Sequence, residues 1–224
     1  MTPKKRPAKR SKAGKYPSSQ RHATAAAALA EPLGYPPLVE SLFPGDQIAL
    51  VPDAFVASQY ELLIELVGEL LRPGMEPENI TLLLTEEDCR EHGPALRVAL
   101  EAAGQAAVRL VVHRPSLRQD LAMLAVSTAG QAIAVNRQLV DADFVLLVQE
   151  VGAAQAESAG ESAFFPRFAD AETIQRHRTA GKGHGKQLTR EMAAAIRELG
   201  AGLVLEYFRE NGQLAFTARH ADYT

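Results

Sequence analysis

The pattern of apolar and polar positions between Leu124 and Val151 predicts the centre of the fold. This stretch holds two apolar runs, Gln131–Val135 and Phe144–Val148, which are separated by a segment of helical character, Asn136–Asp143. Every position from Phe144 to Val148 is apolar, which is typical of a strand buried on both faces of a helix-covered sheet. We therefore expect a strand, a short helix and a second, parallel strand that together form one crossover unit.

The same alternation of strands and helices continues upstream. Apolar runs that end at turn residues predict three strands, at Gln47–Val51, Ile80–Leu84 and Ala107–Val112. Between them, apolar residues at helical spacing predict two helices, at Ser58–Leu71 and Pro94–Ala103. Strands and helices that alternate at this pitch are joined by right-handed crossovers, so the sequence predicts an α/β fold with a mostly parallel, doubly wound sheet.

Downstream of the central stretch, the pattern changes to a hairpin. A short helix is expected at Ala171–Arg178, and a longer one from an N-cap at Thr189 to Leu199. Asn211-Gly212 is a strong signal for a hairpin turn, and apolar runs flank it at Leu203–Phe208 and Leu214–Ala218. We expect an antiparallel pair of strands at the C-terminal end.

Residues 1–37 differ in composition from the rest of the chain. They are rich in Lys, Arg, Pro, Ser and Ala, which predicts a disordered tail before a single domain at residues 38–224. Residues 1–22 hold eight basic and no acidic side chains, whereas the remaining residues hold 16 basic and 27 acidic ones, a net charge of −11. Such a tail can contact nucleic acid or an acidic partner. We favour a merely solvated tail, because no aromatic side chain interleaves with the charges of Lys4–Lys15 to stack on bases.

Cysteine content and hydropathy limit the class of protein. Cys89 is the only cysteine, which excludes an internal disulfide and a multi-cysteine metal site. No apolar run approaches the roughly 18 residues that span a bilayer, and the N-terminus lacks the apolar segment of a secretory signal. We expect a cytoplasmic protein that does not contact a membrane.

Ligands of open parallel sheets bind beyond the carboxyl ends of the strands, where this chain has four polar candidates. Asp53 follows the first predicted strand, where it could orient a base or a sugar hydroxyl or only fix a turn. Arg90, His113 and Arg114 follow the second and third strands and favour an anion. These four residues are our candidates for the pocket of a small anionic ligand.

Three other segments carry weaker signals. Glu86–Asp88 offers oxygen ligands for a hard cation, but three consecutive side chains do not face one point, so a solvated loop is favoured. Cys89 could be a reactive thiolate, yet inert packing is the better interpretation because no histidine lies at a useful spacing. Gly181–Lys186 offers a generic anion site before a helix, but a mobile surface loop is the better interpretation. The six histidines show no metal-binding spacing.

Several segments carry a family pattern when they are taken in order: Gly45–Asp53, Pro77–Leu83, Val111–His113, Gly130–Arg137, Val140–Val145 and Glu172–Ile174. Together they resemble the N-terminal domain of the lactate racemase family, whose members use a nickel-pincer nucleotide. The likeness extends from Leu38 to Ala218. It implies a Rossmann-like α/β domain with a mostly parallel sheet and helices on both faces.

The resemblance also places the family's working motifs, and most of them are altered here. After the first strand, Asp53 keeps the acid of the motif, while Val56 stands where the family has an arginine. After the second strand, Cys89 occupies the position of a catalytic histidine, and only Arg90 of that motif is retained. His113-Arg114-Pro115 imitates the motif but follows a different strand.

Later motifs of the family are altered as well. Gly152 falls at the position of a second histidine, and Ser162 at that of the lysine that holds the cofactor. A histidine of the metal region falls at Arg178, with His177 one residue short. Racemisation by hydride transfer needs the cofactor and a paired acid and base, so these changes imply that an active racemase is not expected.

The leading hypothesis is therefore a catalytically degenerate, free-standing lactate-racemase-like domain, a pseudoenzyme that acts as a binding or interaction module without metal or cofactor. Asp53, Arg90, His113 and Arg114 would form its residual pocket. A divergent 2-hydroxy acid racemase or isomerase, or a nucleotide-using enzyme, is the alternative, and the first of these would retain the nickel-pincer nucleotide. In a third hypothesis the basic tail is the functional part.

Overall fold

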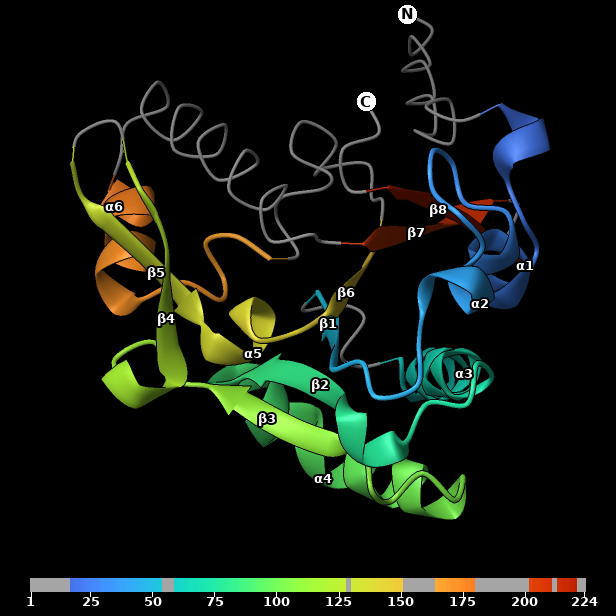
Figure 1. The fold of residues 1–224 in the computed structure, drawn as a ribbon, viewed down its shortest axis with the longest axis horizontal. Coiled ribbons are helices and arrows are strands. Elements are labelled where there is room, and N and C mark those ends of the chain that lie inside the picture. Colours follow the sequence, from blue (N-terminus) through green and yellow to red (C-terminus); the bar gives the residue numbers. More distant parts are fainter. Residues whose placement is uncertain are drawn as a thin grey trace, which may run out of the picture.

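The structure, a computed structural model, is built around a six-stranded sheet (Figure 1). It describes residues 17–53, 59–127, 130–150, 164–179, 202–210 and 213–220. The strand order is β3-β2-β1-β6-β7-β8, parallel from β3 to β7, and β8 returns antiparallel to β7. The strand bounds are Ile48–Pro52 (β1), Ile80–Thr85 (β2), Arg109–His113 (β3), Phe144–Glu150 (β6), Leu203–Glu210 (β7) and Gln213–His220 (β8). The predicted α/β fold with a C-terminal hairpin is confirmed.

Helices cover one face of this sheet. Leu50 of β1 and Leu146 of β6 pack with them in one apolar cluster, whereas Ala49 and Val51 belong to the cluster on the opposite face. Successive residues of a strand point to opposite faces, so a strand apolar at every position is buried on both. The helices of the first face are α1 (Ala25–Ala30), α2 (Leu38–Ser41), α3 (Tyr60–Leu71) and α4 (Glu86–Ala102).

Short helices and a small second sheet contribute the cluster on the other face. Leu139 and Phe168 belong to the same apolar cluster as Val51 of the main sheet, and Ile174 packs against this cluster. The elements are β4 (Leu121–Val126), β5 (Ala132–Asn136), α5 (Arg137–Val140) and α6 (Ala171–Thr179), and single 3₁₀ turns lie at Ser18–Gln20 (η2), Pro77–Asn79 (η4) and Arg118–Asp120 (η5). Figure 1 shows β4 and β5 as an arm beside the main sheet, with α6 next to β5.

The prediction that Gln131–Val135 forms a parallel crossover unit with Phe144–Val148 is wrong. β5 pairs antiparallel with β4 in the separate two-stranded sheet. A parallel crossover needs roughly a dozen residues or more, and the stretch between β5 and β6 is shorter. The partner of β6 is instead β1, with Leu50 opposite Leu146.

The second predicted helix begins earlier than expected, at Glu86 instead of Pro94. Thr85 caps it, because the Thr85 hydroxyl accepts a hydrogen bond from the Asp88 N–H at 3.2 Å and the Asp88 carboxylate accepts one from the Thr85 N–H at 3.1 Å. This reciprocal capping box starts the helix directly after β2. Pro94 then lies inside the helix and does not begin it.

The disorder predicted for residues 1–37 is wrong for residues 17–37, and residues 1–16 lie outside the described part. His22 and Leu33 make backbone bridges to β8, with hydrogen bonds of 2.8 to 2.9 Å. Between them, Leu29 and its neighbouring alanines on α1 are buried against the sheet. The backbone groups on the outer edge of β8 need hydrogen-bond partners, and His22 and Leu33 supply them. The small apolar side chains of α1 are sufficient to pack against the sheet between these two bridges.

Several other predictions lie outside the described residues. They concern the helix expected from Thr189 to Leu199, the loop Gly181–Lys186 and the family positions Val56, Gly152 and Ser162. Among the described helices, none combines the length and apolar character that crossing a membrane requires.

Candidate ligand cavity at the ends of β2 and β3

A cavity of about 370 Å³ opens at the carboxyl ends of β2 and β3. This volume lies within the range of roughly 300 to 1,000 Å³ that is usual for small-molecule sites. Its position agrees with the rule that open parallel sheets bind ligands beyond the carboxyl ends of their strands. The lining residues are Thr85, Glu86, Glu87, Asp88, His113, Pro115, Pro166, Arg167, Ile174 and Arg178.

The first turn of α4 forms one wall of the cavity. Asp88 is buried there, and besides capping the helix it forms an ion pair with Arg167. The charges of Asp88 and Arg167 therefore balance each other inside the protein. Glu86 and Glu87 of the same turn are exposed and leave negative charge at the cavity.

His113 lies at the base of the cavity with both ring nitrogens engaged. Its Nε2 lies 2.9 Å from the carbonyl oxygen of Ala169, and its Nδ1 lies 3.2 Å from the amide nitrogen of Asn136. A carbonyl only accepts, so we assign the proton to Nε2, and Nδ1 then accepts from Asn136. The ring also meets Phe168 edge to face, with centroids 5.5 Å apart.

Burial lowers the pKa of His113, although the hydrogen bond to Ala169 and the nearby carboxylates of Glu86, Asp120 and Asp170 act in the opposite direction. The side chain is only 2% exposed, so the charged form loses its hydration. His113 is therefore a neutral imidazole that donates once and accepts once. In this state it has no lone pair left for a substrate proton.

Helix α6 supplies the opposite wall through Ile174 and Arg178. Arg178 is exposed in the last turn of α6, and within the described part of the chain no carboxylate forms an ion pair with it. Pro115 and Pro166 add apolar surface beside Ile174. The cavity thus combines an apolar wall, one available guanidinium and two glutamates.

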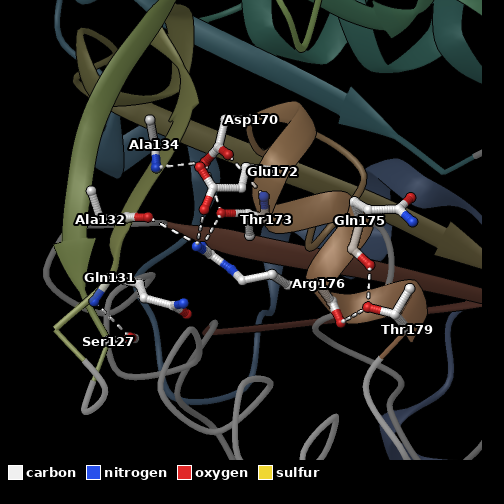
Figure 2. A network of polar contacts seen from close by, with 10 residues as sticks. All are labelled: Ser127, Gln131, Ala132, Ala134, Asp170, Glu172, Thr173, Gln175, Arg176 and Thr179. Carbon is white, nitrogen blue, oxygen red and sulfur yellow. Dashed lines mark hydrogen bonds and ion pairs between the residues drawn. The ribbon is translucent and has the colours of Figure 1, made fainter.

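A polar network fixes α6 in this position (Figure 2). Asp170 accepts hydrogen bonds from the Ala134 N–H at 3.0 Å, and from the N–H and the hydroxyl of Thr173, both at 2.8 Å. Arg176 donates to the Ala132 carbonyl at 3.2 Å. Burial alone would raise the pKa of Asp170, but these hydrogen bonds and the charge of Arg176 outweigh it and lower the pKa. The ionised carboxylate therefore holds α6 against β5.

The structure does not gather the four sequence candidates around one cavity. His113 lines it, whereas Asp53, Arg90 and Arg114 are not among the lining residues. Arg90 is exposed on α4 near Glu91, and Arg114 forms an ion pair with Asp120 at 2.7 Å.

Asp53 belongs to a different group, at the carboxyl ends of β1, β6 and β7. Its carboxylate accepts a hydrogen bond from the Glu150 N–H at 2.9 Å. Burial and the nearby Asp53 carboxylate raise the pKa of Glu150, which Arg209 opposes. Tyr207 is 1% exposed, and its hydroxyl finds no hydrogen-bond partner among the residues that the structure describes. Burial raises the pKa of Tyr207 above the usual range. Asp53 thus joins the two central strands and lies apart from the cavity.

Sequence reasoning missed two of the groups that line the cavity. The sequence favours a solvated loop for Glu86 and Glu87, whereas in the structure they start α4 and line the cavity. The sequence analysis does not single out Arg167 either. The signal that could have identified it is its position within the aromatic run Phe164–Phe168, because an arginine among buried aromatic residues needs an acidic partner. Cys89 does not line the cavity and packs against the core on the helical face.

The described residues provide no set of side chains that could bind a metal ion. Within the described residues, no three His, Cys, Asp or Glu side chains are grouped so that they could hold one. A cluster of at least three such ligands is the usual minimum for a protein-bound transition metal.

Comparison with known proteins identifies related folds. The family model of the lactate racemase N-terminal domain matches residues 3–189 of this chain. The lactate racemase apoprotein from Thermoanaerobacterium thermosaccharolyticum has a similar structure, with a TM-score of 0.59 and 16% sequence identity. That similarity covers 88% of this chain and 51% of the racemase, so this chain spans about half the length of that protein. At this identity the likeness establishes the fold alone. No curated protein matches the sequence.

Proposed function

Because this chain belongs to the family of lactate racemase N-terminal domains, we propose that it is a ligand-binding domain without racemase activity, and that a small monocarboxylate binds in the cavity between α4 and α6. This proposal has two parts, the loss of catalysis and the nature of the ligand. Each rests on different residues and has its own experiment.

The observation that carries the first part is the bonding of His113. It is the only histidine among the described residues that line the cavity. Racemising a 2-hydroxy acid requires a base that takes a proton from the substrate. The contacts to Ala169 and Asn136 occupy both ring nitrogens, so this histidine positions the wall of the cavity and does not exchange protons.

The positions at which the family carries its other working residues support the same conclusion. Cys89 replaces a family histidine and packs into the core, away from the cavity. Arg178 replaces a histidine of the metal region, and a guanidinium does not ligate nickel. Within the described part of the chain there is no cluster of metal ligands, so the described residues do not fit a nickel-pincer nucleotide. We expect no resident cofactor.

The second part of the proposal follows from the charges of the cavity. Arg178 offers a planar pair of donors that suits a carboxylate. Glu86 and Glu87 repel a multiply charged anion such as a phosphate, which leaves a single negative charge as the best match. Ile174 and the two prolines suit a short apolar body attached to that carboxylate.

Calorimetric titration with D-lactate and with L-lactate tests the ligand. We expect Arg178→Gln to weaken binding at least about tenfold, because a hydrogen bond to a charged group contributes about 1.5 to 3 kcal/mol. Arg90→Gln is the matched control, since Arg90 is an exposed arginine that does not line the cavity. Equal weakening by both variants, or no binding by the wild-type chain, would exclude this cavity as the carboxylate site.

Metal analysis and a racemisation assay test the loss of catalysis. We expect less than stoichiometric nickel in the purified protein and no conversion of D-lactate to L-lactate after incubation with the nickel-pincer nucleotide. Stoichiometric nickel or measurable racemisation would establish the divergent enzyme instead.

A further inference from the structure

The walls of the cavity between α4 and α6 carry charges of opposite sign. On the α4 side, Glu86 and Glu87 are exposed, and neither carboxylate forms an ion pair with another described residue. On the α6 side, the exposed guanidinium of Arg178 also has no ion-pair partner in the part of the chain that the structure describes. One cation and two anions therefore line the same cavity without neutralising one another.

The Glu86 carboxylate acts on the base of the cavity. Burial lowers the pKa of His113, and the negative charge of Glu86 is among the effects that oppose this shift. The influence of one charge on a buried ring weakens with distance and with intervening water. The Glu86 carboxylate is thus close enough to the floor of the cavity to act on a molecule bound there.

Both charged walls are held in place by contacts within the chain. Thr85 and Asp88 form the capping box of α4, and Asp88 also pairs with Arg167, so the helix turn that carries the two glutamates is fixed. The polar network of Figure 2 fixes α6, whose last turn carries Arg178. Charged groups on fixed elements bind a ligand with a smaller loss of conformational entropy than groups on loose ones.

The balance of charge in the cavity favours a ligand that carries both signs. The charges of Asp88 and Arg167 cancel, and His113 is neutral, so Arg178 and the two glutamates leave one negative charge in excess. A ligand with a carboxylate alone pairs with Arg178 but adds to this excess. A ligand that also bears an ammonium group supplies a partner for each wall.

We propose that the ligand of this cavity is a short aliphatic amino acid in its zwitterionic form. Its carboxylate is bound by Arg178, and its ammonium group by Glu86 and Glu87. The inference rests on the proposed function, in which the cavity takes a monocarboxylate, and it adds the second charged group of that ligand. The apolar wall formed by Ile174 and the two prolines contacts the short side chain, and a cavity of about 370 Å³ has room for a molecule of this size.

Two other kinds of charged ligand fit these walls less well. A simple amine matches the glutamates, but it leaves Arg178 without an anion and brings a like charge into its cavity. A dicarboxylate matches Arg178, but its second carboxylate lies beside the glutamates. Each wall thus selects for one charge and against the other, which is how specificity for a zwitterion arises.

Titration calorimetry of the full chain with L-alanine and with L-lactate tests this proposal, because the two molecules share a carbon skeleton and differ in an ammonium group against a hydroxyl. We expect L-alanine to bind at least about tenfold more tightly, the gain typical of a charge-assisted hydrogen bond. If L-lactate binds and L-alanine binds no more tightly, this inference is wrong while the monocarboxylate site stands. If neither molecule binds, both proposals fail.

The double change Glu86→Gln with Glu87→Gln tests which residues bind the ammonium group. We expect it to weaken the binding of L-alanine at least about tenfold and to leave L-lactate bound at least as tightly as in the wild type, because fewer negative charges then repel the anion. Retained binding of L-lactate also shows that the variant is folded. Glu101→Gln is the matched control, since Glu101 is exposed on α4 and does not line the cavity. A preference for L-alanine that survives the double change would overturn the assignment.

Amide chemical shifts of the isotope-labelled full chain give a second measurement that needs no variant. We expect L-alanine to shift the signals of the first turn of α4 and of the last turn of α6 together, since it contacts both walls. L-Lactate should shift mainly those of α6. Shifts by L-alanine that are confined to one wall, or that lie away from the cavity, would contradict the proposed contacts.

Discussion

The carboxylate of Asp170 accepts a hydrogen bond from the N–H of Ala134 at 3.0 Å, and this contact joins helix α6 to strand β5 (Figure 2). The same carboxylate caps the first turn of α6 through Thr173. One acidic residue therefore starts the helix and closes the edge of the small sheet. Through α6, it also fixes Ile174 and Arg178 at the cavity.

Replacing Asp170 should loosen this junction. We expect Asp170→Ala to lower the free energy of unfolding by about 1 to 3 kcal/mol, the usual cost of leaving partly buried donors without a partner. Asp170→Asn should cost less, because its amide oxygen still accepts one hydrogen bond. Urea denaturation measures both values. Asp141→Ala, at an exposed position after α5, is the control and should change the stability by less than about 0.5 kcal/mol.

The ionisation of Asp170 also predicts how acid affects the junction. Its pKa is lowered in the folded protein, so its contribution to stability is complete above the unfolded pKa of about 3.9 and is lost as the pH falls through the folded pKa. We expect the difference in stability between the wild type and Asp170→Asn to shrink as the pH is lowered from 5 to 2. A constant difference across this range would contradict the role of the ionised carboxylate.

His113 predicts a second pH dependence, in a different range. The pKa of His113 in the folded protein lies below the unfolded value of about 6.5. As the pH falls, the unfolded chain therefore binds the proton at a higher pH than the folded protein does. The stability contributed by the neutral ring is therefore complete above pH 6.5 and is lost as the pH falls below it. We expect His113→Gln to destabilise the protein at pH 7.5 and to flatten the dependence between pH 6.5 and 5. Thermal unfolding at several pH values measures both effects, and equal slopes for the two proteins would refute the assignment.

A buried ion pair joins the last two strands of the main sheet. Glu206 accepts hydrogen bonds from Arg219 at 3.1 and 3.2 Å and from Gln149 at 3.0 Å. We expect Arg219→Met to cost about 3 to 5 kcal/mol of unfolding free energy, because it removes a cation from a buried carboxylate. The double change Arg219→Met with Glu206→Gln should cost less than the single one. If the double variant is instead the less stable, the penalty does not come from the uncompensated charge.

The N-terminal segment should contribute to the core like any other element. Leu29 on α1 is buried against the helical face of the sheet, so we expect Leu29→Ala to cost about 2 to 5 kcal/mol. Val39→Ala is the matched control because Val39 is exposed on α2. Chemical denaturation of both variants measures the two values. A small effect of Leu29→Ala would mean that α1 is not part of the cooperative core.

The strands that the sequence predicted correctly are those in which nearly every residue is buried. Phe144–Val148 is buried on both faces, so its apolar run identifies it without knowledge of its neighbours. Ile80–Thr85 is a further example. The hairpin of β7 and β8 was predictable because its pairing is local and its turn residues are specific.

The elements that the sequence predicted wrongly depend on which partner each segment meets in the fold. The apolar run of β5 has the composition of a core strand, and only the short connection to β6 excludes a parallel pairing. Residues 17–37 have the composition of a disordered segment, and they become ordered because the edge of β8 offers backbone partners nearly 200 positions away, as in the bridge between His22 and Phe216. Local composition does not contain this information.

The sequence by itself determined the α/β class, the buried strands of the main sheet and the C-terminal hairpin, because each of these follows from residue types along the chain. The tertiary structure decided which residues line the cavity. It places Arg178 and Glu86 there together with His113, and it directs Asp53 and Arg114 to other partners. Side-chain chemistry is fixed by the sequence, but whether a ring nitrogen or a carboxylate is free depends on neighbours that only folding brings within hydrogen-bond distance.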